Sequence, residues 1–289
     1  MERLNEAIAS VERQLEGEVD VRRASQIALM SEHHFRRLFS TLAGMSLSEY
    51  VRRRRMTLAV ASVVSGQEAL QDVALRFGYA SGDAFSRAFK AVHAVGPEGA
   101  RQPGAVLRSQ PKLTFTITIE GSTTMNYRIV EKDGFTLAGL RTRIPLIYEG
   151  VNPTAAEFVE KISEEQWAKI DDLSDQEPAG VLSVHDAISP SRDEGTELDY
   201  YVAAATSGPV PDDFDRLDVP AMTWLVVESN GAFPAALQEL WPKAFGEWFP
   251  ANLYQSAPGP ELVVTDFADD EQTRGRYELW IPVEKTPVS

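Results

Sequence analysis

A nine-residue pattern occurs twice in this chain, and its two copies begin 50 residues apart. SEHHFRRLF begins at Ser31 and SGDAFSRAF begins at Ser81, with serine, phenylalanine, arginine and phenylalanine at matching positions. Each copy follows a short alanine-containing segment of helical character. A helix, a tight turn and a second helix with an exposed arginine form a helix-turn-helix, whose second helix enters the DNA major groove. The repeat therefore predicts a helical unit that reads DNA.

Helical spacing of apolar residues extends this prediction over the first third of the chain. Ser46 or Ser48 is suited to cap a long helix, and Gly66 is suited to end it. This long helix would hold the two reading motifs apart. The expected helices cover residues 2–16, 21–29, 32–43, 46–64, 69–76 and 82–92.

The pattern changes after GPEGARQPGAV. Leu113, Phe115, Ile117 and Ile119 alternate with polar residues, which is typical of a strand. We therefore expect two domains: an all-α double helix-turn-helix domain at 1–108 and an α+β domain at 112–289.

The second domain shows a weak internal repeat, in which a strand, a helix and two strands occur twice. Two such units related by a pseudo-twofold axis would face each other across a cleft. The first unit is expected at 127–143, 153–171, 179–186 and 197–206, and the second at 220–229, 232–248, 261–267 and 275–284.

The net charge of −15 divides unevenly along the chain. Residues 21–108 contain 13 Lys and Arg against 6 Asp and Glu, a net charge of +7, whereas residues 109–289 carry a net charge of −18. A basic segment attracts phosphates and an acidic one is repelled by them. The acidic part is expected to have another role, and much of its charge to serve as a solubilising surface.

Several functional classes lack support in the sequence. There is no cysteine, so disulfides and thiolate metal sites are excluded. No apolar run approaches the roughly 18–20 residues that span a bilayer, and the N-terminus does not resemble a secretory signal. We therefore expect a cytoplasmic protein without a membrane partner. The spacing of the four histidines predicts no metal site, and no catalytic or nucleotide-binding motif was found, so we expect no catalytic residue and no cofactor.

Arg37 and Arg87 occupy matching positions in the two expected reading helices. A guanidinium that bonds guanine O6 and N7 contributes roughly 1–3 kcal/mol of discrimination. A surface charge or a salt bridge is the alternative for each arginine. Asp83 is suited to accept from cytosine N4 or to cap its helix. The phenylalanines of both motifs are expected in the core. The candidate DNA-binding residues are His33, His34, Arg36, Arg37, Gly82, Asp83, Ser86 and Arg87.

Residues 1–107 resemble the DNA-binding domain of AraC/XylS-type transcriptional regulators. The resemblance rests on the first motif, on SLSEYVRRRRMTLA and on VALRFGYASGDAFSRAFKAVHAVGPEGAR. GPEGAR lacks the aromatic residue usual near the end of this signature. The resemblance implies a double helix-turn-helix that binds double-stranded DNA, with RNA polymerase as a further partner.

Residues 112–289 resemble the GyrI-like effector-binding domain of Rob-type regulators through YRIVEKDGFTLAGLR, LQELWPKAFGEWFP and YELWIPVEK. The resemblance implies a small-molecule pocket with an acid at its base, which corresponds here to Glu278. A carboxylate beside aromatic rings would attract a lipophilic cation. The alternative is that Glu278 pairs with Arg276 or another base and that the aromatic residues form ordinary core. The candidate effector-binding residues are Glu278, Trp280, Trp241, Trp224, Tyr148 and Tyr201.

These observations predict a DNA-binding transcriptional regulator controlled by a small-molecule effector, and not an enzyme. Two alternatives stay open. Some GyrI-like domains are thought to hydrolyse reactive electrophiles, and Glu278 would serve as general base if a dry pocket raised its pKa. The second domain would otherwise sequester a toxin or another protein.

Overall fold

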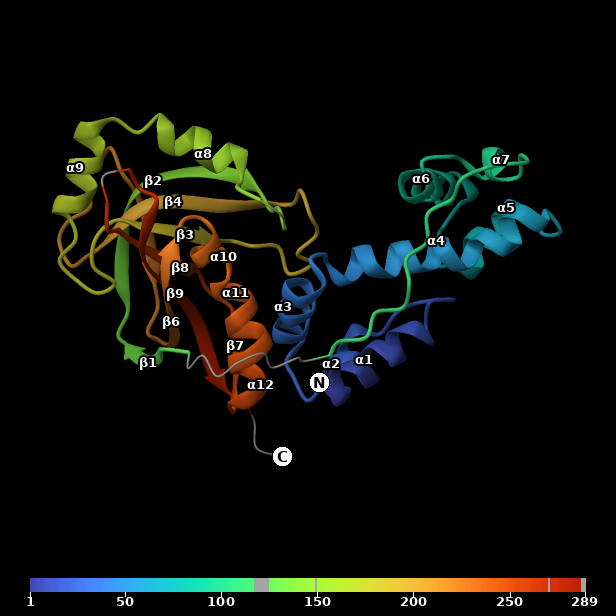
Figure 1. Cartoon of the computed structure of the whole chain (residues 1–289), viewed down its shortest axis with the longest axis horizontal. Coiled ribbons are helices and arrows are strands. Elements are labelled where there is room, and N and C mark those ends of the chain that lie inside the picture. The colour runs from blue at the N-terminus through green and yellow to red at the C-terminus, as the bar shows by residue number, and fades with distance from the viewer. Residues whose placement is uncertain (117–124, 149, 270, 287–289) are drawn as a thin grey trace. The chain divides into compact units, whose positions relative to one another are not determined.

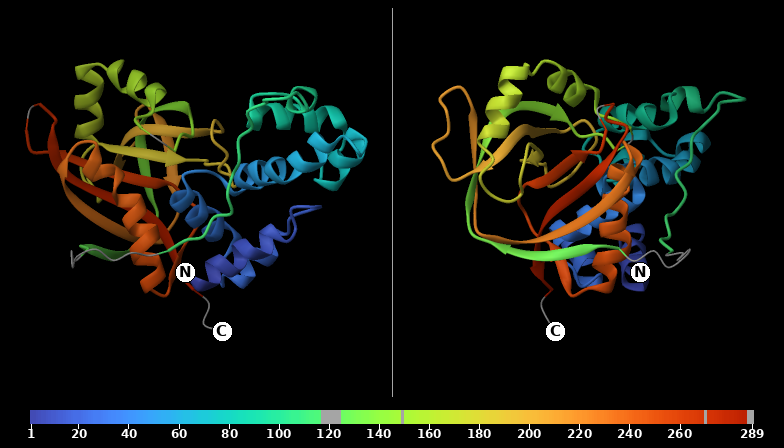
Figure 2. Two further views of the ribbon diagram at one scale, coloured as in Figure 1. Left: turned by 45° about the vertical axis from the view of Figure 1, so that its right-hand side comes forward. Right: turned by 60° about the vertical axis from the view of Figure 1, so that its left-hand side comes forward.

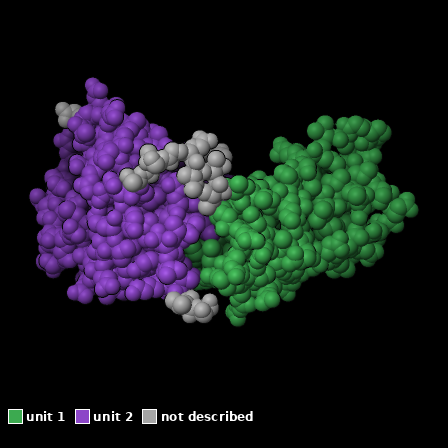
Figure 3. All heavy atoms as spheres, turned by 60° about the horizontal axis from the view of Figure 1, so that its bottom comes forward, with its two compact units in different colours: residues 1–35, 45–117 green, residues 36–44, 118–289 purple. Residues whose placement is uncertain are grey.

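The computed structural model describes residues 1–116, 125–148, 150–269 and 271–286 (Figure 1). The chain forms two compact units, coloured separately in Figure 3. Unit 1 comprises Met1–Phe35 and Met45–Ile117, and unit 2 comprises Arg36–Gly44 and Thr118–Ser289. The sequence predicted a single boundary near residue 110. That domain boundary stays a prediction, and the compact units differ from it in that Arg36–Gly44 belongs to unit 2.

The helices of the N-terminal region agree closely with the predicted ranges. The Ser46 side chain accepts a hydrogen bond from the Glu49 amide and begins the long helix α4, and Gly66, with φ of 63°, ends it. The helices are α1 (Glu2–Glu12), α2 (Val21–Ile27), α3 (Glu32–Ala43), α4 (Leu47–Ser65), α5 (Leu70–Arg76), α6 (Gly82–His93) and α7 (Pro97–Ala100).

The phenylalanines of the repeated pattern are fully buried, as predicted. Phe85 and Phe89 share an apolar cluster with Met56 and Val63 of α4 and with Phe77, which directly follows α5. Burial of large aromatic rings is a major source of folding free energy. The shared positions of the repeat therefore form the scaffold of the helical unit.

The segment after α7 differs from the prediction. Residues 113–116 form no strand, and the remainder of the predicted strand, which includes Ile117 and Ile119, lies outside the described residues. Side chains of unit 1 occupy the backbone groups that a strand partner would need. The Leu113 amide donates to the Tyr50 hydroxyl at 3.1 Å, and Phe115 exchanges two hydrogen bonds with the Asn5 side chain at 2.8 and 2.9 Å. Alternation alone could not reveal these partners.

Unit 2 contains an antiparallel sheet with the strand order β1-β6-β9-β8-β3-β4-β2-β5, and β7 pairs with β9 outside this path. The predicted strand 127–143 is two strands, separated at Asp133 and Gly134. The short strands β5 and β7 were not predicted. The strands are β1 (Tyr127–Lys132), β2 (Phe135–Pro145), β3 (Leu182–Asp186), β4 (Glu197–Thr206), β5 (Asp215–Val219), β6 (Met222–Ala232), β7 (Tyr254–Ser256), β8 (Glu261–Phe267) and β9 (Arg274–Lys285).

The sheet curls around one of its faces (Figure 2). Phe135 of β2 and Trp224 of β6 have ring centroids 6.3 Å apart, although four strands separate β2 from β6 in the sheet order. We call this the inner face. It carries an apolar core in which Tyr201, Val184 and Leu262 are direct cross-strand neighbours. Because strand residues alternate between faces, Tyr200, His185 and Glu261 form the adjacent row on the opposite, outer face.

Helices pack on the outer face. Phe158 of α8 and Ile170 of α9 belong to the same apolar cluster as Tyr200 and Val202 of β4. A second group of short helices contacts β6 and β9 and includes one π-helical turn. The helices are α8 (Pro153–Glu160), α9 (Glu164–Asp172), α10 (Ala235–Gln238), α11 (Leu240–Lys243), η1 (Ala244–Trp248) and α12 (Phe249–Ala251).

Candidate functional site

Helix α6 presents the predicted DNA-reading residues of the second motif. Ser81 caps the helix by accepting from the Ala84 amide at 3.2 Å, so the cap is Ser81 and not Asp83. Asp83 and Arg87 are exposed one turn apart, whereas Ser86 is half-buried and donates to the Gly82 carbonyl at 2.7 Å. Among the predicted DNA-reading residues of α6, Asp83 and Arg87 are thus the exposed ones.

Helix α3 places the residues of the first motif differently. His33 and Arg36 are half-buried, whereas His34 is 2% exposed and Arg37 is 5% exposed. Arg37 lies in unit 2 and forms a buried ion pair with Glu261 of β8 at 2.6 Å. A salt bridge was the alternative considered for this arginine. In this structure the guanidinium is paired with Glu261, and base reading by Arg37 stays a prediction.

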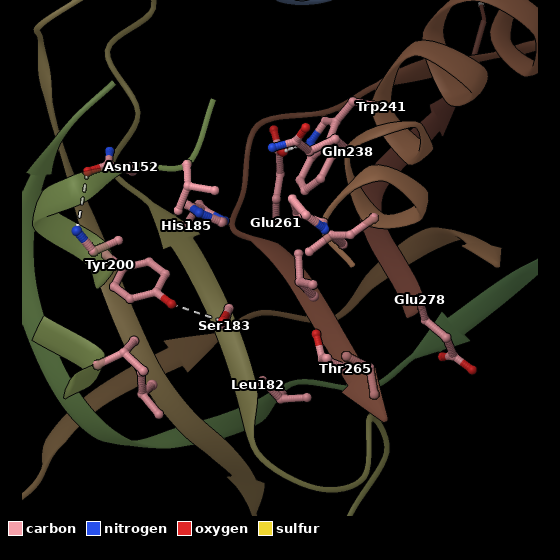
Figure 4. Close-up of a pocket in the computed structure, with 18 of the residues that line it drawn as sticks. Asn152, Leu182, Ser183, His185, Tyr200, Gln238, Trp241, Glu261, Thr265 and Glu278 are labelled. Carbon is pink, nitrogen blue, oxygen red and sulfur yellow. Dashed lines mark hydrogen bonds between the residues drawn. The ribbon is translucent and has the colours of Figure 1, made fainter. Parts of the chain in front are cut away.

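A cavity of about 1930 Å³ lies in unit 2. It is larger than the roughly 300–1,000 Å³ typical of small-molecule sites. Tyr200, His185 and Glu261 supply one row of its wall from three adjacent strands, and Trp241 faces Glu261 from α11 (Figure 4). The wall combines apolar and aromatic side chains with many charged and polar ones. Apolar surface supplies most of the contact in a ligand pocket, and polar groups fix the orientation of the ligand.

Glu261 is a buried carboxylate in the wall of the cavity. It is 7% exposed, accepts from Arg37 at 2.6 Å and accepts from Trp241 Nε1 at 2.8 Å. Burial alone would raise the pKa of Glu261, but the guanidiniums of Arg37 and Arg192 hold it below its ordinary value. Arg37 also lies over the Phe245 ring, 4.7 Å from its centroid. Glu261 is therefore ionised at neutral pH, with its charge balanced by neighbouring guanidiniums.

Two further ionisable groups line the cavity beside this pair. Arg192 is 7% exposed, and its Nε is buried without a hydrogen-bond partner among the described residues. The backbone carbonyl of Arg192 accepts from the Tyr148 hydroxyl. Burial lowers the pKa of His185, so this imidazole is neutral at neutral pH. The cluster therefore contains two guanidiniums and one carboxylate.

Glu278, the acid predicted from the sequence, lies on the other face of the sheet. It pairs with Val264 of β8, three residues from Glu261, and alternation places the two carboxylates on opposite faces. Figure 4 shows the Glu278 carboxylate directed away from His185. Trp280 lies on the same face as Glu278, as period two predicted, and its Nε1 donates to that carboxylate at 3.0 Å.

Two arginines neutralise Glu278. Arg128 donates to it at 2.7 Å, and Arg276 donates to it at 2.7 Å. Burial would raise the pKa of Glu278, but the hydrogen bonds and charges of these partners lower it below its ordinary value. The hydrolase alternative requires the opposite shift. Pairing with Arg276, the alternative left open by the sequence, is present in this structure.

The predicted effector residues thus divide into three groups. Trp241 and Tyr148 line the cavity, where Trp241 bonds Glu261, and Glu278 and Trp280 line it from strand β9. Within the described part of the chain, Trp224 and Tyr201 are absent from the cavity wall and pack in the inner core. Sequence reasoning missed several wall residues because a period-two pattern does not say which face is hollow. The missed polar wall residues include Glu261, Tyr200, His185 and Arg192.

The ranges that the structure describes hold neither a metal-binding cluster nor a membrane-spanning helix. These residues contain no cluster of three or more His, Asp or Glu side chains arranged to hold a metal ion. Among the same residues, no helix combines the length and apolar character needed to cross a bilayer.

Two family models match the chain. The model described as integron-associated effector binding protein (Cass2) matches residues 128–283, and a helix-turn-helix domain model (HTH_18) matches residues 24–102. The probable transcriptional regulator LumQ of Photobacterium leiognathi is 30% identical over 99 residues, which cover 34% of this chain and 40% of LumQ. The regulatory protein SoxS of Salmonella typhimurium is 35% identical over 60 residues, which cover 21% of this chain and 56% of SoxS. The chain therefore spans less than two thirds of either relative.

Solved structures resemble each part of the chain. SAV2435, solved bound to tetraphenylphosphonium, is 18% identical with a TM-score of 0.44, and the match covers 55% of this chain and 94% of that one. The DNA-binding domain of AdpA, solved with a target DNA, is 25% identical with a TM-score of 0.32, and the match covers 34% and 89%. At these TM-scores the structural similarities assign no function to the chain.

Proposed function

Because the chain belongs to the Cass2 family of integron-associated effector binding proteins and also carries an AraC-type helix-turn-helix domain, we propose that it is a transcriptional regulator controlled by a small molecule. Residues 1–108 bind double-stranded DNA in this proposal, and residues 112–289 bind the effector. RNA polymerase is a further partner. No catalytic step is assigned to either part.

The observation that carries the DNA-binding part is the two-sided character of α6. Phe85 and Phe89 are buried against α4, while Asp83 and Arg87 are exposed on the other side of the same helix. This is the arrangement of a recognition helix, whose buried side fixes the angle at which its polar side meets base edges. Arg87 is suited to guanine and Asp83 to the amino group of cytosine. The corresponding reading residues of α3 are His33, His34, Arg36 and Arg37.

The effector part rests on the cavity of unit 2. Its volume admits a molecule of drug size, and its wall combines aromatic rings with a buried carboxylate. A lipophilic cation fits this chemistry, because aromatic faces and an ionised carboxylate both attract positive charge. Trp241, Tyr148, Trp280 and Glu278 would contact such an effector from different parts of the wall.

We also propose that unit 2 contains two copies of one strand-helix-strand-strand unit related by a pseudo-twofold axis. The sheet order supports this, since β6, β9 and β8 on one side mirror β2, β4 and β3 on the other. The axis would pass between β3 and β8, beneath the cavity. Helices α8 and α9 would correspond to the group from α10 to α12.

The DNA-binding test uses a duplex selected by the full chain from a random-sequence library. Arg87→Ala should weaken binding to this duplex by about 1–3 kcal/mol and relax the preference at one base pair. Lys90→Ala is the matched control, because Lys90 is exposed one turn further along α6. Its loss should lower the salt dependence without changing base preference. Unchanged affinity and preference in Arg87→Ala would refute base reading by α6.

The effector test is a thermal-shift screen of the full chain against lipophilic cations and neutral molecules of the same shape. A ligand at 100 times its Kd stabilises the native state by about 2.7 kcal/mol. Stabilisation by cations and not by their neutral counterparts supports the proposed effector class. Absence of any ligand that shifts the transition would remove the effector part of the proposal.

A further inference from the structure

The charged cluster around Glu261 is already occupied by a cation of the protein itself. The guanidinium of Arg37 donates to Glu261 at 2.6 Å and lies 4.7 Å from the centroid of the Phe245 ring. Trp241 of helix α11 donates to the same carboxylate. A carboxylate and an aromatic face around one delocalised cation are the elements of a cation-binding site.

The occupant comes from helix α3, the predicted reading helix of the first motif, and Arg37 is the residue predicted to contact guanine. Its side chain cannot bond a base while it is buried against Glu261. The same guanidinium therefore has two competing positions, one in the cavity and one on DNA.

We propose that Arg37 is a resident cation of the effector cavity, that a positively charged effector displaces it from Glu261, and that this displacement releases Arg37 to read DNA. This inference rests on the proposed function and specifies how the cavity regulates DNA binding. It assigns charge recognition to Glu261, and it predicts that the effector increases DNA affinity.

The charge balance of the cluster selects the class of effector. Arg192 also acts on Glu261, so the cavity holds two guanidiniums beside one carboxylate. A cationic effector that replaces Arg37 leaves this balance unchanged. A neutral molecule in the same position would remove a partner from a buried carboxylate, which is costly. An anion in that position would be repelled by the charge of the carboxylate. The exchange therefore favours a cation with an apolar or aromatic body.

Burial makes the resident position of Arg37 replaceable. Loss of water contact is the largest cause that lowers the pKa of Arg37, to about 9, and the nearby charge of Arg192 adds to it. Even with Glu261 beside it, the charged guanidinium is thus less well stabilised in the cavity than in water. An effector with a larger apolar body would bury more surface at the same position and return Arg37 to solvent.

The first experiment measures cation affinity of the full chain by calorimetry. The probe is naphthylmethylguanidinium, which carries the same charged group as Arg37, and naphthylmethylurea is its neutral counterpart. Glu261→Gln should weaken binding of the guanidinium probe by about 10-fold or more, because a charged hydrogen bond is lost. The affinity for the urea should change little. Glu239→Gln is the control: Glu239 is exposed, pairs with Lys243 and is not in the cavity wall.

Removal of the resident cation should have the opposite effect. Arg37→Ala should increase the affinity for the guanidinium probe. In the parent, Arg37 competes with the probe for Glu261, and in the variant this competition is absent. Arg37→Lys keeps a competing charge and should leave the probe affinity closer to that of the parent. Equal probe affinity in the parent and in Arg37→Ala would overturn the displacement.

The second experiment measures binding to the selected duplex without and with the probe. A saturating concentration of naphthylmethylguanidinium should increase the affinity of the parent for DNA by about 5- to 150-fold. This is the usual range of coupling between two sites. Glu261→Gln should bind DNA more tightly than the parent in the absence of the probe, since Arg37 loses its ionic partner. Arg37→Ala should show no effect of the probe on DNA binding. A parent-like DNA affinity in Glu261→Gln would overturn the release of Arg37.

The outcomes separate this inference from the proposed function. If the parent selects no duplex, the DNA-binding function fails, and the probe affinities of the Glu261 and Arg37 variants still decide whether the two cations exchange. If the parent binds DNA and the probe but the probe leaves DNA affinity unchanged, the proposed function stands and the inference is refuted.

Discussion

Glu278→Gln tests whether the acid predicted from the sequence stabilises the fold or recognises the effector. In the parent this carboxylate accepts from Arg128, Arg276 and Trp280. Glutamine keeps one acceptor oxygen but directs its amide hydrogens at groups that also donate. A hydrogen bond to a charged group contributes about 1.5–3 kcal/mol when both partners are buried.

That magnitude must be reduced here, because the side chains of Arg128 and Arg276 are 36% and 51% exposed and solvent screens their charges. We therefore expect Glu278→Gln to lower the free energy of unfolding by about 1–2 kcal/mol. For a unit of this size that corresponds to a decrease in Tm of about 2–8 °C.

Urea unfolding of the full chain, followed by tryptophan fluorescence, measures this loss. All five tryptophans lie between residues 167 and 280, so the signal reports on unit 2. Glu239→Gln is the control, since its pair with Lys243 is exposed and should contribute less than about 0.5 kcal/mol.

The loss should depend on pH in a defined direction. The folded-state pKa of Glu278 is below its ordinary value of 4.5, so the stabilisation is fully present above that value and disappears as the pH falls through the folded pKa. The difference between parent and variant should therefore be constant near neutral pH and shrink below about pH 4.5. A variant as stable as the parent at neutral pH, with a selective loss of cation binding, would refute the structural role and favour Glu278 as the effector acid.

Two further substitutions test the fold itself. Gly139→Ala would place a Cβ 2.1 Å from the Val202 carbonyl oxygen and should destabilise unit 2 by about 1–3 kcal/mol or more, because it overpacks a strand pair. Urea unfolding should show this loss. Gly208→Ala is the control and should show no loss, since its Cβ would come no closer than 3.4 Å to the Thr206 hydroxyl. Tyr50→Phe removes the hydroxyl that accepts from the Leu113 amide and donates to Glu12 at 2.6 Å. It should lower the free energy of unfolding by about 1–3 kcal/mol. Faster hydrogen exchange at the Leu113 amide would report the loss, and unchanged exchange would contradict the anchoring of this segment.

The helical part of the fold could be predicted closely from the sequence. Its caps and breakers act locally: Ser46 begins α4, Gly66 ends it, and the predicted limits of α3 match the structure. The strand expected at Leu113 failed for a non-local reason, because Tyr50 and Asn5 take up the backbone groups that a neighbouring strand would bond.

The candidate site was predictable only in part. Alternation correctly placed Trp280 beside Glu278, since that relation depends on spacing within one strand. The face on which the cavity opens depends on how the whole sheet curls and where its helices pack, which no local pattern contains. For this reason Tyr201 was predicted where Tyr200 lines the wall, and Glu261 was overlooked.

The alternation of β3, β4 and β8 has a consequence for how this protein can diverge over evolutionary time. His185, Tyr200 and Glu261 face the cavity, whereas their immediate chain neighbours Val184, Tyr201 and Leu262 belong to the inner core. A substitution at one set of positions would therefore alter the inner core, and a substitution at the other set would alter the wall of the cavity. A lineage could change the chemistry of the cavity by substitutions at alternate positions without altering the inner core, although a change at Tyr200 would also affect its packing with Phe158.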